Sequence, residues 1–283
     1  MQTLIFLASI SWMVLTLSGF RAFQGTTLRS AWGWTLVAAI SLALAESGSN
    51  PATLVNLRLA ASLTTFCPMV ALLGAKRPQH HAWQLIVLSL WMVLVLPVAE
   101  AHFAGRGAAA RMHDARGWFL LVLIVIGVAN YTATRFWPSC WLVAVGQVML
   151  LADQLPILRH TTSLTERLTG VVCLGLAVAL VRIGWPGRVV RSEATADRIW
   201  IDFRDWFGML WSLRIAQRLN QSAAGRGEIV RIGWTGLEPH DENGDPSTAS
   251  VLGYEERMCR LLLRFVSRDW LQRRAQKAGD KRA

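Results

Sequence analysis

The strongest constraint on this chain is a series of long apolar runs in its first 185 residues. They are residues 3–20, 31–45, 57–75, 82–101, 117–136, 139–155 and 168–185. A helix needs about 20 mostly apolar residues to cross the hydrocarbon core of a membrane. The runs therefore predict an all-α, multi-pass transmembrane helix bundle with about seven spans over residues 1–185. The second run is short, and a tilted or re-entrant segment is the alternative there.

The composition agrees with a membrane protein. Of the 283 residues, 53% are hydrophobic and only 17% are charged, whereas soluble domains carry about 25% charged residues. The 14 Trp fit as well, because Trp concentrates at the membrane–water boundary. In such a protein we assign the formal net charge of +11 to contact with anionic lipid headgroups. The expected partner is therefore the lipid bilayer, and nucleic acid is not expected.

The charge density changes sharply after Trp185. Residues 1–185 hold 12 Lys and Arg and 5 Asp and Glu, whereas residues 186–283 hold 17 and 13. The chain therefore ends in a small, basic and water-facing tail. With seven spans, the side of the membrane that carries this tail collects 23 basic residues against 6 on the other side. Because Lys and Arg concentrate in the cytoplasm, we predict a cytoplasmic (inner) membrane protein with its N-terminus outside and its tail in the cytoplasm. The first run lacks the positive start and the cleavage site of a signal peptide, so we expect a retained helix.

The tail begins with an aromatic helix over residues 199–213. At 100° per residue, one broad face gathers Trp200, Phe203, Trp206, Phe207 and Trp211. A helix of this kind close to a membrane exit is typical of one that lies in the lipid interface. The same face is equally consistent with the core of a small cytoplasmic domain, and both interpretations stay open.

A second amphipathic helix is predicted over residues 251–276, which makes the tail mostly helical. Its apolar face consists of Tyr254, Met258, Leu261, Leu262 and Phe265. Beside that face runs an arginine stripe at spacings of three and four, formed by Arg257, Arg260, Arg264 and Arg268. The stripe suits anionic lipid or a protein partner, or it is simply a solvated face. Between the two helices, residues 227–234 predict one strand and residues 240–247 predict a turn-rich loop.

Polar groups inside the bundle give the candidate site. On the predicted topology, Glu46, Glu100 and Asp153 each lie at the outer end of a helix. The same side carries His102, His113, Asp114 and His160. Ionisable groups at membrane depth are costly and often functional, so these residues could bind a substrate or ion. The alternative is that each one reaches water from its helix end.

Two shorter signals concern helix packing. Pro138 predicts a tight hairpin between two spans, because a helix seldom continues through the residue before a proline. Asn130, Thr132 and Gln147 are expected to form hydrogen bonds between helices.

The sequence contains no recognisable catalytic motif. Nucleotide-binding, zinc-protease and serine-hydrolase patterns are absent, and the four cysteines are not spaced as a metal or redox pair. We therefore expect no cofactor and no bound metal. The favoured hypothesis is a scaffold, assembly factor or complex subunit whose tail engages lipid and a protein partner. The alternatives are a small-solute transporter or channel, and a membrane enzyme that acts on a lipid-linked substrate through the outer carboxylates and histidines.

Overall fold

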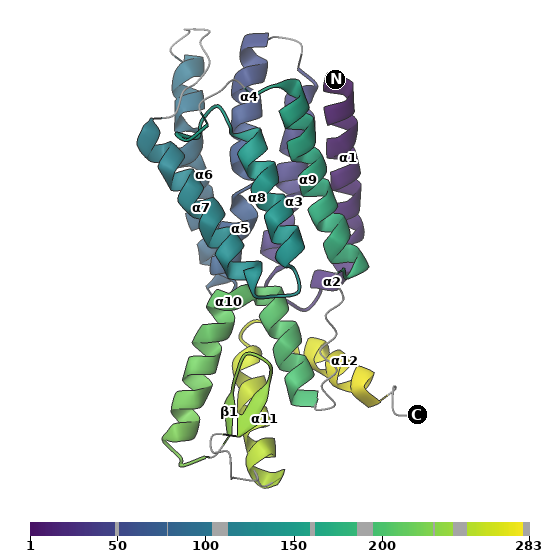
Figure 1. Cartoon of the computed structure of the whole chain (residues 1–283), viewed down its shortest axis with the longest axis vertical. Coiled ribbons are helices and arrows are strands. Elements are labelled where there is room, and N and C mark those ends of the chain that lie inside the picture. The colour runs from purple at the N-terminus through teal and green to yellow at the C-terminus, as the bar shows by residue number, and fades with distance from the viewer. Residues whose placement is uncertain are drawn as a thin grey trace.

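A computed structural model describes residues 1–48, 51–77, 79–103, 113–158, 162–185, 195–228, 230–239 and 248–279. Within these ranges the chain forms twelve helices and two short strands. Figure 1 shows two parts: a bundle of roughly parallel helices formed by the first 185 residues, and below it a smaller C-terminal domain formed by residues 195–279.

The bundle contains nine helices within the described ranges. They are α1 (Gln2–Ser18), α2 (Phe20–Phe23), α3 (Arg29–Glu46), α4 (Pro51–Thr64), α5 (Cys67–Leu73), α6 (His80–Phe103), α7 (Asp114–Thr132), α8 (Trp137–Leu150) and α9 (Leu164–Ile183). Pro68 and Pro138 lie in the first turns of α5 and α8, where a backbone N–H has no partner in the helix anyway. α7 and α8 pack together across the turn before Pro138, so the predicted hairpin is confirmed. A capping box of Ser163 and Glu166 starts α9, which satisfies two of its free N–H groups.

Among the residues that the structure describes, four stretches are long and apolar enough to cross a membrane: Thr53–Leu73, His81–Ala101, Asp114–Thr132 and Leu164–Ile183. Two further apolar helices, Gln2–Ser18 and Trp137–Leu150, are shorter. The 31–45 run lies inside α3, which has 18 residues. The protein thus has membrane-capable helices in a helical bundle, and the arrangement with seven spans remains a prediction.

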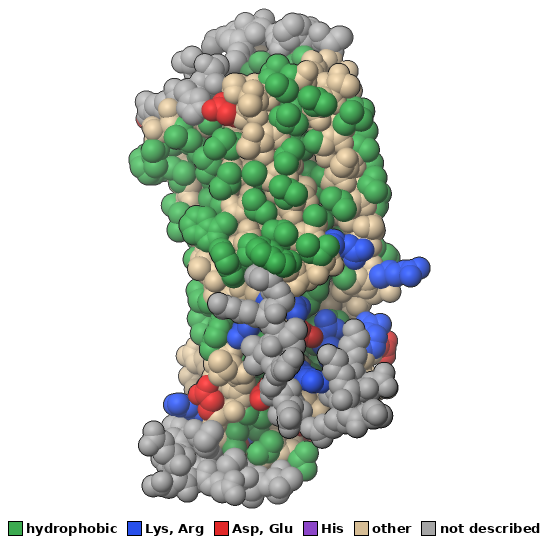
Figure 2. All heavy atoms as spheres, turned by 45° about the vertical axis from the view of Figure 1, so that its right-hand side comes forward, with side chains coloured by type: hydrophobic (Ala, Val, Ile, Leu, Met, Phe, Trp, Pro, Cys, Tyr) green, Lys and Arg blue, Asp and Glu red, His purple; other side chains and the backbone are tan. Residues whose placement is uncertain are grey.

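The outer surface of the bundle is strongly apolar. Large side chains such as Leu85, Val125 and Ile183 are 69%, 64% and 72% exposed. On the face shown in Figure 2, hydrophobic side chains cover the bundle, and Lys and Arg side chains gather near its junction with the C-terminal domain. An apolar surface of this extent is typical of a membrane-embedded protein.

The C-terminal domain consists of α10 (Thr195–Ala224), β1 (Val230–Ile232), β2 (Leu237–Pro239), α11 (Thr248–Leu262) and α12 (Arg268–Gly279). The predicted strand is present as β1, which pairs with β2 in antiparallel register. This two-stranded sheet is a small departure from an all-α fold. The single helix predicted over 251–276 is wrong, because the chain leaves the helix between Leu262 and Arg268. The predicted loop at 240–247 lies outside the described residues.

The aromatic face of α10 is the core of this domain. Trp200, Phe203 and Phe207 are at most 1% exposed, and the rings of Phe203 and Phe207 stack at 4.6 Å. Phe265 closes against both rings edge-on. These three side chains of α10 therefore contact protein rather than lipid, which corrects their interfacial placement in favour of the domain-core interpretation. The apolar face predicted for α11 is also buried there, through Tyr254, Met258 and Leu262.

α10 bends at Gly208 and presses the bend against the bundle. Gly208 has φ 76° and ψ −178°, a combination that is essentially restricted to glycine. The two limbs of α10 form an inverted V below the bundle (Figure 1). The Leu210 N–H donates to Asn130 Oδ1 of α7 (2.9 Å), and the Tyr131 hydroxyl donates to the Trp206 carbonyl (3.1 Å). Asn130 therefore supplies a partner to the half-helix that begins after the bend.

Ionic contacts also join the bundle to the C-terminal domain. Arg135, in the turn between α7 and α8, lies 3.5 Å from both Asp202 and Asp205. Arg204 Nη2 donates to Asp205 Oδ1 (2.9 Å), and Arg274 Nε donates to Asp202 Oδ2 (2.8 Å). Burial raises the pKa of the Asp205 carboxyl, and the two nearby guanidinium groups act against that rise. The domain is thus fixed to the bundle by paired charges as well as by apolar contacts.

Candidate functional site

Glu46 is buried in an ion cluster inside the bundle. Its side chain is 0% exposed and accepts hydrogen bonds from Arg58 Nε (3.0 Å) and Arg167 Nη2 (3.1 Å). The cluster links α3, α4 and α9. Because both carboxylate oxygens already have guanidinium partners, Glu46 holds three helices together and is not a free ligand for a substrate or ion.

In the part of the chain that the structure describes, the other outer-face candidates do not join Glu46 in a metal-binding set. Glu100 is exposed. Asp153 is exposed too, and it accepts hydrogen bonds from Thr162 Oγ1 (3.3 Å) and Gln154 Nε2 (2.9 Å). His102 lies in α6, but its side chain falls outside the described part of the chain, as does His160 altogether. Among the described residues, no group of three His, Cys, Asp or Glu side chains could hold a metal ion.

The four residues of the arginine stripe have two kinds of environment. Arg257 pairs with Glu228, and Arg260 pairs with Glu256 of the preceding helical turn. Arg264 follows the end of α11 and Arg268 is the first residue of α12, and both are exposed. The charge of the stripe is therefore partly neutralised within the protein.

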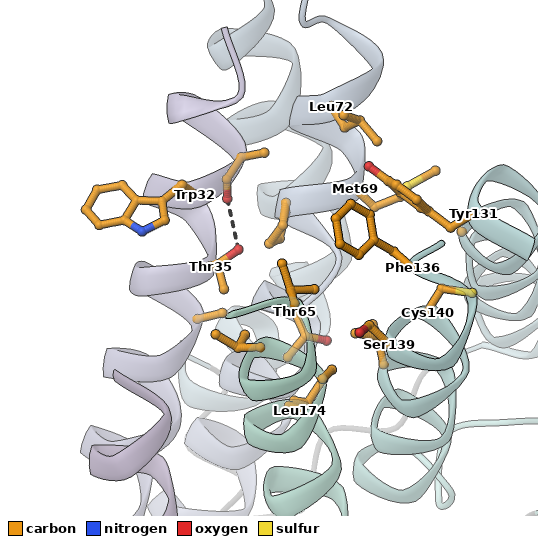
Figure 3. Close-up of a pocket in the computed structure, with 18 of the residues that line it drawn as sticks. Trp32, Thr35, Thr65, Met69, Leu72, Tyr131, Phe136, Ser139, Cys140 and Leu174 are labelled. Atoms are coloured by element: carbon orange, nitrogen blue, oxygen red, sulfur yellow. Dashed lines mark hydrogen bonds between the residues drawn. The ribbon is translucent and has the colours of Figure 1, made fainter. Parts of the chain in front are cut away.

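The site that sequence reasoning missed is a cavity inside the bundle. It has a volume of about 300 Å³ and is lined by α1, α3, α5, α7, α8 and α9. Figure 3 shows side chains from several helices, among them Phe136, Met69 and Leu174, around it. Most of the lining is apolar, and small residues such as Gly127 and Ala144 leave the space open. Nothing lies within 4 Å of a Cβ placed on Gly127.

One wall of this cavity comes from the C-terminal domain. Trp206 of α10 lines the cavity together with Phe23 and Phe136. Its ring lies 5.3 Å from Phe23 and 5.4 Å from Phe136, edge-on to both. Trp206, two residues before the bend of α10, therefore forms part of the cavity wall.

The cavity lining carries unused hydrogen-bond donors. Trp12 Nε1, Ser139 Oγ and Trp206 Nε1 are buried, and none has a hydrogen-bond partner among the described residues. Trp12 is 3% exposed and Ser139 is 5% exposed. By contrast, the Thr35 hydroxyl donates to the Ala31 carbonyl of its own helix (Figure 3). Buried polar groups in proteins are nearly always bonded, so these three donors are exceptions among the described residues that line the cavity.

The polar residues within the apolar runs behave in three ways. Gln147 of α8 donates to the Thr65 carbonyl between α4 and α5 (3.1 Å), which confirms a hydrogen bond between helices. Asn130 also bonds outside its own helix, to α10. Thr132 donates to the Val128 carbonyl of its own helix α7 (2.6 Å), as threonine hydroxyls in helices commonly do, and its side chain also bonds the Cys140 thiol of α8.

Comparisons with protein-family models, with curated proteins and with solved structures gave no match. The fold and the cavity together define a helical protein with membrane-capable helices and an internal apolar cavity.

Proposed function

We propose that this chain is a non-catalytic integral membrane protein whose bundle holds the apolar chain of a lipid. The observation that carries this proposal is the cavity of about 300 Å³. Its volume lies at the lower end of the range for small-molecule sites, which are mostly apolar with a few placed polar groups. A fatty acyl or isoprenoid chain would contact the apolar walls, and an ester or hydroxyl oxygen would accept from Ser139 or one of the two indoles.

The character of the lining favours lipid binding over solute transport. A path for ions or polar solutes needs polar groups that replace the water around them. Arg182 is the single charged side chain in the described lining, and Glu46 is engaged by two arginines. These features support an apolar ligand and give no support to a polar path.

The placement in the cell is part of the same proposal. We infer a cytoplasmic (inner) membrane with the N-terminus outside and the C-terminal domain in the cytoplasm. Support comes from four basic residues: Arg21 in α2, Lys76 after α5, Arg135 before α8 and Arg182 near the end of α9. These helix ends face the C-terminal domain in Figure 1. A domain held there by Arg135 is suited to engage a protein partner, which fits a scaffold, assembly factor or complex subunit.

The test is to fill the cavity. Gly127→Leu would place a large apolar side chain in open space that the ligand needs. Gly33→Leu is the matched control, because Gly33 is also helical, is partly buried, has nothing within 4 Å of an added Cβ and does not line the cavity. Each protein would be purified in mild detergent, and its bound lipids would be extracted and identified by mass spectrometry.

We expect an equimolar, chemically uniform lipid in the wild type and in Gly33→Leu. In Gly127→Leu this lipid should be strongly depleted while the protein stays folded. Equal lipid content in all three proteins would show that the cavity is not the binding site.

A further inference from the structure

A second concave site lies at the junction of the bundle and the C-terminal domain. This basic groove has a volume of about 360 Å³ and contains Lys76, Arg214, Arg218 and Arg264. Lys76 follows α5, and Arg264 follows α11. Arg214 and Arg218 belong to the part of α10 after the bend at Gly208. The backbone fixes this arrangement, because the Arg77 N–H donates to the Arg264 carbonyl (2.8 Å).

The groove collects positive charge without compensation. Within the described part of the chain, none of its four cations forms a salt bridge with a carboxylate, although Arg214 lies over the ring of Trp211 (5.4 Å). By contrast, Arg257 and Arg260 of the arginine stripe each have a glutamate partner. Four like charges in one concavity repel each other and attract anions.

The apolar side chains that line the groove form what we call its floor. It includes Trp211 and Phe265, whose rings pack edge-on at 4.8 Å. The Trp211 indole donates to the Leu72 carbonyl (3.1 Å), so the floor is continuous with the end of α5. A ligand that combines a phosphate with a short carbon segment would match both the rim and the floor.

The groove lies at the level expected for lipid headgroups. Leu73 ends one of the four membrane-capable stretches, and Lys76 follows three residues later. Basic pockets at the cytoplasmic ends of membrane helices are typical sites for anionic headgroups.

We propose that the basic groove binds a phosphate group, carried either by an anionic phospholipid or by a soluble phosphate ester. This site is separate from the cavity and does not depend on the function proposed for it. Arginine binds phosphate through paired N–H groups, and Arg214, Arg218 and Arg264 provide three such groups around one opening.

The test uses the full-length protein in a neutral detergent and isothermal titration calorimetry. The three titrants are short-chain phosphatidic acid, short-chain phosphatidylcholine and inorganic phosphate. The groove variant is Arg214→Gln/Arg218→Gln. The control variant, Arg268→Gln/Arg273→Gln, removes the same charge from exposed residues of α12 that do not line the groove. Arg273 Nη2 donates to the Gln24 carbonyl (3.4 Å), so the control also lies beside the bundle.

We expect the wild type to bind phosphatidic acid more tightly than phosphatidylcholine. Each cation near a membrane surface contributes about 1 kcal/mol, which corresponds to about 5-fold in affinity. The groove variant should therefore bind phosphatidic acid about 25-fold more weakly, with an unchanged unfolding midpoint, and the control variant should bind like the wild type.

Two further outcomes separate the sources of the phosphate. Weak binding of inorganic phosphate would assign the site to a lipid headgroup, and tight binding that is lost in the groove variant would assign it to a soluble ester. Unchanged affinity of the groove variant for every titrant would overturn the proposal. An equal loss in the control variant would also overturn it, because the effect would then come from general surface charge.

Discussion

At the scale of single residues, Glu46 is a buried charge in the bundle whose stability depends on its ion pairs. Its carboxylate is fully buried between two guanidinium groups from other helices. Removing one member of a buried ion cluster leaves the remaining charge without compensation. Glu46 therefore stabilises the bundle through its charge, although burying the cluster is itself costly.

Glu46→Gln tests this role. The variant removes the carboxylate that pairs with Arg58 and with the buried Arg167, so we expect the free energy of unfolding to fall by about 3–5 kcal/mol. Thermal unfolding in detergent is the measurement. Glu100→Gln is the control because Glu100 is exposed, and a variant at Glu46 that unfolds like this control would contradict the argument.

Neither arginine partner of Glu46 could be predicted from the sequence. Arg58 is 12 residues away from Glu46, and Arg167 is 121 residues away. In the sequence, Arg58 and Arg167 look like ordinary charges that flank apolar runs. The cavity is harder still to predict, because it consists of missing volume: Gly127 and Ala144 look like ordinary helix residues until the neighbouring helices are placed around them.

At the scale of elements, the bend in α10 determines how the C-terminal domain meets the bundle. A Cβ at Gly208 would lie 2.3 Å from Asn130 Nδ2, and the glycine has a positive φ. Both the backbone conformation and the close approach therefore exclude a larger residue.

Gly208→Ala should lower the free energy of unfolding by about 1–3 kcal/mol from backbone conformation alone, with a further loss from the contact with Asn130. Gly225→Ala is the control, since Gly225 follows α10, has no positive φ and offers ordinary contact distances to an added Cβ. Chemical unfolding and limited proteolysis of the C-terminal domain would measure the difference. Equal stability of the two variants would mean that the bend does not support docking.

The elements that the sequence predicts well are those with a local cause. Apolar runs give the helices of the bundle, and Pro138 gives the turn before α8. The break between α11 and α12 has no proline or glycine to mark it. It forms because residues 265–267 bond to another part of the chain: the Thr27 N–H donates to the Phe265 carbonyl (2.9 Å), and the Ser267 N–H donates to the Gly25 carbonyl (2.6 Å).

The contacts between α10 and the bundle determine which variants can test the C-terminal domain for a protein partner. Deleting residues 199–283 would remove Trp206 from the cavity and leave Asn130 without its partner in α10. Such a truncation would disturb the bundle as well as any docking surface. Point variants on exposed residues of α11 and α12 are the cleaner test for a protein partner.

At the scale of the whole molecule, the proposed orientation places Glu100 outside the cell and Arg260 in the cytoplasm. Both side chains are exposed, so each can be replaced by cysteine in a background without the four native cysteines. On intact cells a membrane-impermeant maleimide should label Glu100→Cys and should label Arg260→Cys only after the cells are opened. The reverse pattern would overturn the orientation and would place the basic groove outside the cell.

The indole of Trp206 belongs to the C-terminal domain and yet lines the cavity of the bundle. A ligand in the cavity that contacts Trp206 would therefore contact the C-terminal domain directly. A ligand that binds more tightly to one conformation of α10 must stabilise that conformation by the difference in its binding free energy. A protein partner that binds the C-terminal domain and favours one conformation of α10 would, by the same linkage, change the affinity of the cavity for its ligand.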